Sequence, residues 1–220
     1  MLPQPESDEA AGLTTPMLLS AYARGLFPMA NHRLDRNPEW VFPYRRGIIP
    51  LNHFHVPRSL EKVLRRGGFE ITVNRAFARV IAACARPTPG RENTWISVDI
   101  EKAYTRLHHE GHAHSVECWM DGVLAGGLYG VQLRGAFFGE SMFSDIADTS
   151  KVALVHLVRR LVKGGFVLLD TQFITDHLRM FGAIEITGAE YLERLDRALS
   201  TESADFYCLP RSIQSSTQMS

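Results

Sequence analysis

The sequence lacks the cysteine patterns of small secreted and metal-binding proteins. Its three cysteines, Cys84, Cys118 and Cys208, are far apart and form no CxxC pair. They therefore predict neither a disulfide framework nor a zinc site, and a reducing compartment fits them best.

An excess of charge is also absent. Lys plus Arg and Asp plus Glu both number 24, so no overall positive field marks a nucleic-acid binder. A local basic patch is still sufficient to contact phosphates, because only the contact face must be basic.

Long apolar runs and targeting signals are missing as well. No apolar run approaches the roughly 18 residues needed to cross a bilayer. The first residues, MLPQPESDEAAG, are acidic and polar, unlike a signal peptide. We therefore expect a soluble cytoplasmic protein without a membrane partner, and a monomer is the default expectation.

Glycine-rich phosphate loops are the last absence. The sequence has no P-loop and no dinucleotide-binding glycine pattern. Acetyl-CoA enzymes of the N-acyltransferase fold carry a glycine-rich turn before their major helix, where backbone amides hold the pyrophosphate. The matching turn here, SDIADTSK, contains no glycine. An enzyme of that fold with such a turn would use an acyl donor other than acetyl-CoA.

What remains is the composition of an ordinary globular protein. Apolar residues make up 45% and charged residues 22% of the 220 residues. This length suits one domain, or a large domain with a small appendage.

The N-terminal part differs in pattern from the rest. Residues 1–12 and 210–220 are expected to be loose ends, rich in polar residues and proline. TTPMLLSAYARGLF predicts a short helix, and the proline-rich stretch after it predicts irregular structure. We expect residues 1–44 to form a small N-terminal domain with a flexible start and no core of its own. Residues 45–220 would form the main domain.

The main domain shows regular periodicity. Helices are predicted over PRSLEKVLRRG, NRAFARVIAACA with Asn74 as its cap, and VDIEKAYTRLHHEG, with a strand over FEITV. Three strands, HSVECWM, VLAGGLYGVQL and GAFFGESMF, follow, separated by turn signals at Asp121-Gly122 and Arg134-Gly135.

Helices and strands alternate in the remaining sequence. A long helix, TSKVALVHLVRRLVKGG, is predicted to be capped by Thr149 or Ser150. The strand FVLLD, the helix TDHLRMFG, the strand AIEIT and the helix GAEYLERLDRALS follow it. This order predicts an α+β fold with a GNAT-like mixed sheet, the N-acyltransferase type, flanked by helices.

Polar residues at two strand ends form the first candidate site. Glu140 is the one acid in GAFFGESMF, and Asp170 and Gln172 end the run FVLLDTQF. Alternation places Asp170 and Gln172 on one face if the strand stays extended. The neighbouring strand ends would bring Glu140 close, and the three could hold and orient an amine. A helix cap or a structural ion pair with an arginine is the alternative interpretation.

Apolar and basic residues suggest two further features, each with a simpler alternative. A pocket for a bulky apolar side chain could be lined by Leu128, Phe137, Met142, Phe143, Leu154, Leu157 and Leu169, although the residues alone favour a plain core. Phosphates could be contacted by Arg58, Lys62, Arg65 and Arg66 with Arg45 and Arg46. A solvated helix face is the favoured interpretation of that basic set.

The histidines of HHEGHAH invite a metal site but do not support one. His108 and His112 have the four-residue spacing of zincins, yet His109 stands where the catalytic Glu would be. The residues also straddle a predicted helix end and a strand, and no carboxylate or cysteine completes a ligand set. Surface or packing histidines are favoured, and no metal is expected.

With these residues in place, the sequence resembles the bacterial leucyl/phenylalanyl-tRNA–protein transferases. The resemblance runs from about Thr15 to Pro210. It is carried in order by AYARGLFPM, TWI, HAHSVECW, GGLYGV, FFGESMFS, SKVALVHL, LLDTQF and TDHLRMFGAIEI. Each segment is weak by itself, but together they are specific.

The resemblance implies an activity without a cofactor. The family moves Leu, Phe or sometimes Met from aminoacyl-tRNA to the N-terminal Arg or Lys of a protein, which marks that protein for proteolysis. It also implies an N-acyltransferase domain behind a small N-terminal domain. The expected partners are the acceptor end of an aminoacyl-tRNA, which is a substrate, and proteins with N-terminal Arg or Lys.

The resemblance also assigns roles by position. Asp170, Gln172 and Glu140 match the active-site polar residues. We expect the first two to position the incoming α-amine, and Glu140 to help bind the reacting amines or the cationic side chain of the acceptor. The aminoacyl pocket would be lined by Leu128, Phe137, Leu154, Leu157, Leu161 and Leu169. The tRNA would be bound by Met29, Arg58, Lys62, Arg66 and Trp95, with Trp95 beside the terminal adenosine.

Four positions depart from the family pattern. Met29 stands where other members have a tryptophan, Leu157 and Leu161 replace aromatic pocket residues, and Thr171 stands where some members have cysteine. A small-molecule N-acetyltransferase and a non-catalytic binder of tRNA ends or basic N-termini are the alternatives. The glycine-free turn argues against the first, and the presence of Asp170 and Gln172 argues against the second.

Overall fold

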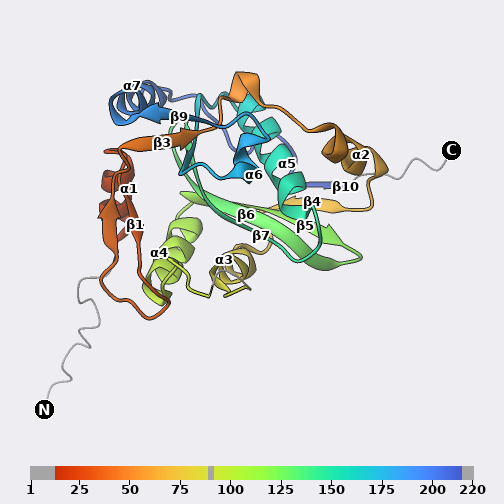
Figure 1. The fold of residues 1–220 in the computed structure, drawn as a ribbon, viewed down its shortest axis with the longest axis horizontal. Helices are drawn as coiled ribbons and strands as arrows, with labels where there is room; N and C mark the ends of the chain where they lie inside the picture. The colour runs from red at the N-terminus through yellow and green to blue at the C-terminus, as the bar shows by residue number, and fades with distance from the viewer. Residues whose placement is uncertain (1–12, 89–91, 215–220) are drawn as a thin grey trace, which may run out of the picture.

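The computed structural model describes residues 13–88 and 92–214, and its centre is one large mixed sheet (Figure 1). Within these residues eight strands are ordered β10-β4-β5-β6-β7-β8-β3-β9. Their bounds are β3 (Arg45–Ile48), β4 (Glu70–Val73), β5 (Ala113–Met120), β6 (Val123–Leu133), β7 (Ala136–Ser144), β8 (Leu168–Gln172), β9 (Ile184–Thr187) and β10 (Ser212–Gln214). Neighbouring strands are antiparallel except β7 and β8, which are parallel.

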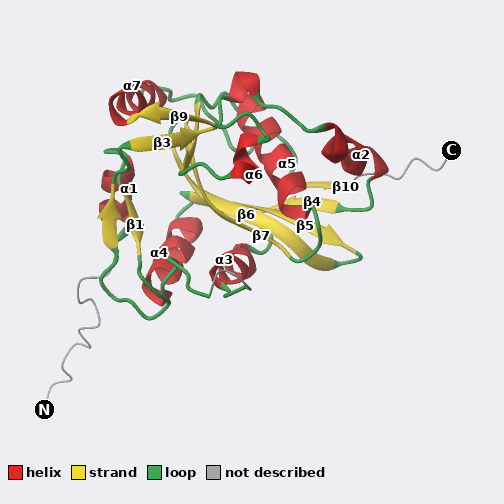
Figure 2. Ribbon diagram, viewed as in Figure 1, coloured by secondary structure: helices red, strands yellow, loops and turns green. Residues whose placement is uncertain are grey.

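Helices cover both faces of the sheet (Figure 2). They are α1 (Thr15–Tyr22), η1 (Leu51–His53), α2 (Arg58–Arg66), α3 (Phe77–Ala85), α4 (Val98–His109), α5 (Thr149–Lys163), α6 (Asp176–Arg179) and α7 (Gly188–Leu199). In Figure 1, α3 and α4 lie on one side of the long strands β6 and β7, and α5 and α6 lie on the other. The fold is therefore a mixed α+β structure, as the order of predicted elements indicates.

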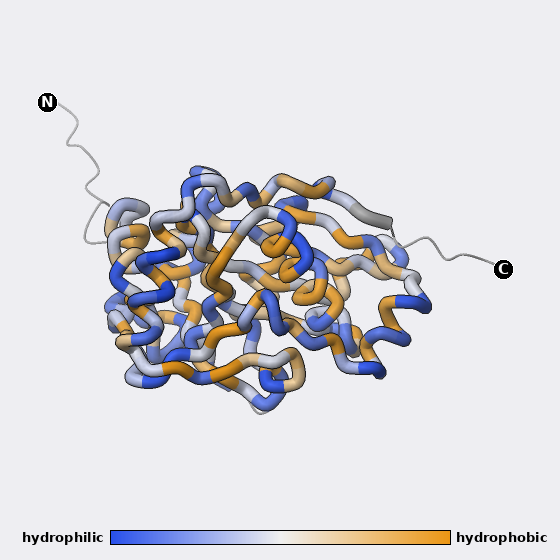
Figure 3. Tube along the Cα trace, turned by 90° about the horizontal axis from the view of Figure 1, so that it is seen from above, coloured by the Kyte–Doolittle hydropathy of each residue, from blue (hydrophilic) through white to orange (hydrophobic). Residues whose placement is uncertain are grey.

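Strand alternation divides the core between the two faces. Tyr129 and Phe138 pack with α3 and α4, whereas their chain neighbours Leu128 and Phe137 pack with α5. Figure 3 shows hydrophobic stretches running through the middle of the molecule, with hydrophilic stretches around them. The strands that hold the candidate site are thus buried on both faces.

The three-stranded β5-β6-β7 meander confirms both turn predictions. Asp121 and Gly122 have φ of 49° and 75°, and Arg134 has φ of 51°. These left-handed conformations match the tight hairpin turns that such residues favour.

Two of the predicted helix caps are wrong. Asn74 adopts φ of 59° and uses its side chain to accept from the Ser115 amide at 2.9 Å, so α3 begins three residues later. The first residue of α5 is Thr149, but its hydroxyl donates to the Ala125 carbonyl instead of capping the helix. In both places the side chain bonds a neighbouring strand, a long-range choice that local pattern does not reveal.

The stretch predicted to be irregular after α1 contains three short strands. β1 (Phe27–Met29) pairs antiparallel with β2 (Glu39–Val41), and β3 enters the main sheet between β8 and β9. The C-terminal end also differs from its prediction, because β10 pairs with β4. The predicted loose residues 1–12 and 215–220 lie outside the described ranges.

The N-terminal elements pack on the main sheet. Leu18 and Tyr22 of α1 and Phe27 of β1 belong to the same hydrophobic cluster as Tyr104 and Phe138. The core that buries α1 is therefore shared with residues far along the chain.

Candidate active site

A cavity of about 460 Å³ opens where β7 and β8 diverge. The two strands pair only from Ala136 and Leu168 to Phe138 and Asp170, although β7 continues to Ser144. A register shift between Tyr129 and Gly130 further bends β6 against β7. The cavity is lined by apolar residues, namely Phe27, Met29, Trp95, Leu128, Met142, Leu154, Leu157, Leu169, Phe173 and Leu178, and by polar residues, namely Tyr129, Glu140, Ser141, Thr171, Gln172, Thr175 and His177.

Glu140 lies on the part of β7 that has separated from β8. Its Oε1 accepts a hydrogen bond from the Tyr22 hydroxyl at 2.7 Å and from Gln172 Nε2 at 3.2 Å. The Tyr104 hydroxyl donates to Oε2 at 3.4 Å and also contacts the Tyr22 hydroxyl. The carboxyl group is thus held from α1, α4 and β8 at once.

This environment shifts the proton affinity of Glu140. Burial raises the pKa of its carboxyl from 4.5 to about 8, opposed by the hydrogen bond from Tyr22 and assisted by the charge of Asp170. Glu140 therefore titrates near neutral pH, where a carboxyl can exchange a proton with an amine.

Asp170 lies behind the cavity wall and does not line it. Its side chain is fully buried and pairs with Arg46, whose Nε donates to Oδ1 at 2.9 Å and whose Nη2 donates to Oδ2 at 2.5 Å. The Tyr191 hydroxyl donates to Oδ2 at 2.8 Å. The structure thus contains the ion pair with an arginine that the sequence left open as the alternative.

Gln172 reaches the cavity because the strand does not stay extended. Its φ is 56°, in the left-handed region, and its amide donates to Asp170 Oδ1 at 2.9 Å. The condition under which Asp170 and Gln172 would share one strand face, an extended backbone, is therefore not met. Asp170 instead holds the turn that directs the Gln172 side chain to Glu140.

The predicted apolar pocket divides into two groups. Leu128, Leu154, Leu157 and Leu169 line the cavity, as does Met142. Phe137 and Leu161 do not line it and are fully buried on the α5 side of the sheet. The Phe137 ring stacks on Phe206 with a centroid distance of 5.6 Å. Phe137 and Leu161 therefore belong to the hydrophobic core and not to the lining of the pocket.

The residues predicted to bind tRNA lie in two separate places. Met29 and Trp95 line the cavity. Arg58, Lys62 and Arg66 lie on α2 and are exposed, away from the cavity lining, as is Arg65.

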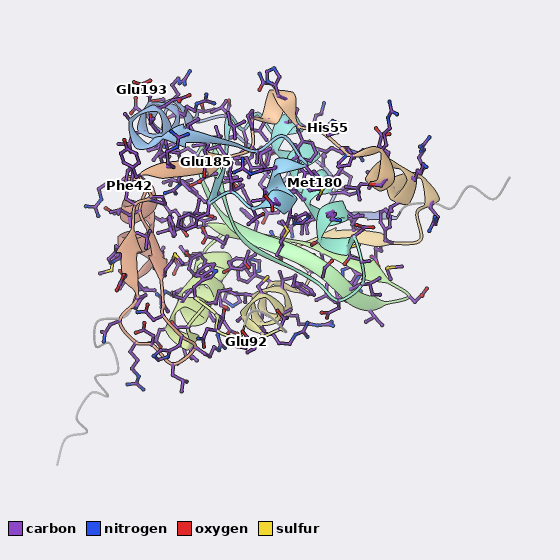
Figure 4. The ribbon with its side chains drawn as sticks, viewed as in Figure 1. Phe42, His55, Glu92, Met180, Glu185 and Glu193 are labelled. Carbon is purple, nitrogen blue, oxygen red and sulfur yellow. The ribbon has the colours of Figure 1, made fainter. Side chains whose placement is uncertain are left out.

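Arg46 was grouped with the phosphate-contacting residues, and that prediction is wrong. Its side chain is 1% exposed and is sandwiched by Phe27 and Tyr191, with its Cζ 4.8 Å and 4.3 Å from the two ring centroids. Arg45 is exposed, and its Nε lies 4.0 Å from Oε2 of Glu185. Glu185 belongs to β9 and is labelled in Figure 4.

The sequence does not predict that Tyr22 and Tyr104 contact Glu140, or that Arg46 pairs with Asp170. Each is separated from its partner by 36 or more positions along the chain, so spacing carries no signal for them. The unusual acid in GAFFGESMF was the available signal, because a buried carboxylate requires donors from somewhere.

Three buried polar atoms around the cavity have no hydrogen-bond partner among the described residues. They are Tyr129 Oη, Thr171 Oγ1 and His177 Nε2. Unpaired buried polar groups cost free energy, roughly 1–3 kcal/mol each. Their gathering around one cavity is typical of a site that binds a polar ligand.

Two negative findings concern the part of the chain that the structure describes, one on metal ligands and one on membrane-spanning helices. No group of three or more His, Cys, Asp or Glu residues is arranged to hold a metal ion there. His114 is buried in a network with Asn74 and Gln132, and its ring stacks on Phe206. No helix in the same ranges is long and apolar enough to cross a membrane.

Comparison with known proteins gives consistent matches. Residues 48–196 match the family model described as leucyl/phenylalanyl-tRNA protein transferase, and residues 12–43 match that of its N-terminal domain. A protein from Phenylobacterium zucineum (strain HLK1) that is named leucyl/phenylalanyl-tRNA–protein transferase is 59% identical to this chain over 192 residues. The match covers 87% of this chain and 86% of the relative. The transferase of the same name from Nitrobacter winogradskyi is 57% identical over 198 residues, and the match covers 90% of this chain and 88% of the relative.

Among solved structures, the L-PGS of Bacillus licheniformis is a distant match. It shares 12% sequence identity with a TM-score of 0.43 and covers 78% of this chain and 58% of that chain.

Proposed function

The chain belongs to the leucyl/phenylalanyl-tRNA protein transferase family, and from this premise we propose its reaction. It is an aminoacyltransferase that moves leucine or phenylalanine, and by extension methionine, from aminoacyl-tRNA to the N-terminal Arg or Lys of a protein. The modified protein then carries a bulky apolar N-terminus that marks it for degradation. The observation that carries this proposal is an apolar cavity that ends at a hydrogen-bonded Glu140 and Gln172.

The apolar walls suit the side chain of the transferred residue. Leu128, Leu154, Leu157 and Leu169 supply branched aliphatic surface from three elements. Burying a leucine or phenylalanine side chain there contributes roughly 1.5–3 kcal/mol. Met29 and Trp95 also line the cavity, and we assign them to contact the terminal adenosine of the donor.

The chemistry is aminolysis of an activated ester. The acceptor α-amine attacks the ester carbonyl carbon, the new C–N bond forms, and the bond to the ribose oxygen breaks. The amine loses a proton and the departing ribose oxygen gains one. Holding the two reactants together supplies much of the acceleration, and no covalent enzyme intermediate is required.

Glu140 is the proton acceptor that the geometry favours. Its pKa of about 8 lies close to that of a protein α-amine, roughly 7.7–8.0. When the pKa values of the proton donor and acceptor are this close, proton transfer between them costs little free energy. Gln172, whose Nε2 bonds Glu140, keeps its carbonyl oxygen as an acceptor that can orient the amine.

Asp170 acts on the reaction through its neighbours. It is shielded from the cavity and bonded to Arg46, Tyr191 and the Gln172 amide, so it is a positioning residue. This revises the direct contact with the amine that the sequence alone predicts.

The remaining features complete the proposal. Arg58, Lys62 and Arg66 supply exposed positive charge for tRNA phosphates. We also propose that residues 1–44 and 45–220 are the two domains, that the main one has the N-acyltransferase fold, and that the protein works as a cytoplasmic monomer without a cofactor.

A transfer assay tests the function. Purified protein is mixed with radiolabelled leucyl-tRNA and a peptide that begins with Arg, beside a matched peptide that begins with Asp. Label is expected on the Arg peptide alone. Salt-sensitive tRNA binding without transfer would indicate a non-catalytic binder, and a parallel reaction with labelled acetyl-CoA that modified the peptide would indicate an acetyltransferase.

A further inference from the structure

A second, smaller cavity of about 180 Å³ lies on another side of α5. Its charged and titratable lining consists of His156, Arg159, Arg160 and Arg211, and its floor includes Ile71 and Val73 of β4. No carboxylate belongs to this lining, and no described carboxylate lies within ion-pair distance of the three arginines. Three cations around a small space create a local positive field in a chain with equal numbers of acidic and basic residues.

Arg160 is the centre of this cluster. Its side chain is buried, and its Nη1 donates to the carbonyl oxygens of Phe206 and Leu209 at 2.8 Å and 2.9 Å. Its Nη2 donates to the carbonyl of Pro210. These partners are neutral, so they orient the guanidinium without cancelling its charge. A buried charge of this kind is stabilised by a nearby ion of opposite sign.

The other two arginines of the cavity are exposed to solvent. Arg159 is exposed on α5, and Arg211 is exposed just before β10 with its guanidinium carbon 4.5 Å from the centroid of the Tyr207 ring. His156 is one turn before Arg159 and Arg160. Burial and those two arginines lower the pKa of His156 to about 4, so its ring is neutral and can donate one hydrogen bond.

The cluster continues toward the basic helix α2. Arg159 also lines an open groove with Lys163, Leu51 and Phe54. The buried Leu60 of α2 belongs to the same hydrophobic cluster as Val155 and Val158 of α5. Figure 1 shows α2, β4 and β10 at one end of the molecule. The positive charge of α2 and that of α5 therefore lie on adjoining elements.

We propose that the cavity formed by His156, Arg159, Arg160 and Arg211 binds a phosphate group of the tRNA acceptor arm. Arginine is suited to this ligand because its planar fork matches phosphate oxygens. Leu154 and Leu157 line the aminoacyl cavity, whereas His156, Arg159 and Arg160 of the same helix line the second cavity. The helix would thus separate the aminoacyl end of the donor from its backbone phosphates. The assignment of this phosphate to a tRNA rests on the proposed function.

The test compares a charge-neutralised variant with a matched control. Arg159→Gln/Arg211→Gln leaves buried Arg160 and its three carbonyl partners in place. Arg197→Gln/Lys102→Gln removes the same charge from exposed sites on α7 and α4. Binding of an aminoacylated tRNA is measured over a salt series, and transfer is measured from both that tRNA and an aminoacyl-adenosine, which has no phosphate.

The expected result is specific to the phosphate-bearing donor. The cavity variant should bind tRNA about ten-fold more weakly, and its salt dependence should be shallower by about one unit of slope per lost phosphate contact. Transfer from aminoacyl-adenosine should match that of the wild type. Equal affinity and slope for the cavity and control variants would overturn the proposal, as would an equal loss with both donors.

A direct probe separates this proposal from the proposed function. Inorganic phosphate is titrated into the wild type while the His156 ring signals are followed by NMR. Saturable shifts that are absent from Arg159→Gln are expected, and their absence from the wild type would contradict the site. A wild type that shows these shifts but transfers from neither donor would refute the proposed function and retain the phosphate site. Phosphate shifts combined with unaltered tRNA binding in the variant would show a site for free phosphate and overturn the tRNA assignment.

Discussion

At the scale of single residues, Glu140 is where the apolar cavity meets hydrogen-bonding groups from distant parts of the chain. Two tyrosine hydroxyls and one amide donate to it, and no described cation forms an ion pair with it. Donors stabilise the ionised form, and burial opposes it. The result is a carboxyl group that changes charge within the physiological range, which an exposed glutamate would not do.

The pH dependence of turnover follows from that carboxyl. Because ionised Glu140 is the proposed proton acceptor, turnover of the wild type should rise with pH, reach half of its maximum near pH 8 and level off above that. Glu140→Gln should lower turnover roughly 100-fold and make this limb shallower, because only the acceptor amine, of pKa roughly 7.7–8.0, still titrates in this range. Steady-state rates from pH 6 to 9 check this, with Glu193→Gln on the outer side of α7 as the control (Figure 4). A limb as steep in Glu140→Gln as in the wild type would exclude Glu140 as its source.

Stability should change with pH in the opposite sense. The pKa of Glu140 is higher in the folded state than its ordinary value of 4.5, so folding favours the protonated form. The associated stabilisation is complete below about pH 4.5 and is lost as pH rises through about 8. The melting temperature of the wild type should therefore fall between pH 6 and 9 more than that of Glu140→Gln. Parallel calorimetric profiles for the two proteins would contradict the shifted pKa.

The buried pair of Arg46 and Asp170 makes a separate prediction. Asp170→Ala should lower the free energy of unfolding by about 3–5 kcal/mol, because Arg46 is left charged and unpaired. Arg46→Met/Asp170→Leu should recover much of that loss, yet transfer should stay low because Gln172 loses the oxygen that holds its amide. Urea unfolding and transfer rates check the set. Full activity in the stable double variant would show that the pair serves only the fold.

At the scale of elements, strong periodicity was informative, whereas some of the short strands could not be predicted from the sequence. The β5-β6-β7 meander and α5 could be predicted because each repeats its pattern over eight or more residues. The three- and four-residue strands β1, β2, β3 and β10 carry no such pattern and form by pairing with distant partners. Glu140 and Gln172 lie on strands with a clear pattern, so the predicted order of the strands was enough to place them close together. Arg46 lies on the short strand β3, 124 positions from Asp170, so its pairing with Asp170 could not be predicted.

The face of α5 that lines the cavity should set the choice of donor. Leu157 is buried against the cavity, so Leu157→Phe fills part of the space that the donor side chain occupies. The variant should shift the ratio of kcat/KM for leucyl over phenylalanyl donors about ten-fold toward leucine. Leu192→Phe, at an exposed position of α7, is the matched control and should leave the ratio unchanged. An unchanged ratio in Leu157→Phe would place the donor side chain elsewhere.

At the scale of the whole molecule, the first described segment is part of the site it packs against. Tyr22 of α1 donates to Glu140, and the Gly25 carbonyl accepts from Arg46 Nη1 at 2.8 Å. Phe27 and Met29 line the cavity. This segment therefore supplies apolar side chains to the shared core and hydrogen bonds to the site. Its loss should lower both the stability of the fold and the rate of transfer.

Separating the two parts of the chain tests that dependence. A protein that begins at Arg45 exposes the apolar surface covered by α1 and β1 and leaves Glu140 without its Tyr22 hydrogen bond. It should unfold at lower urea concentration than the full chain and show no measurable transfer. Adding a peptide of residues 13–44 in excess should restore part of both, because binding to the folded form stabilises it by mass action. Tyr22→Phe in the peptide should restore stability better than activity. A fragment from Arg45 that transfers at the full-length rate would show that the main domain holds a complete site by itself.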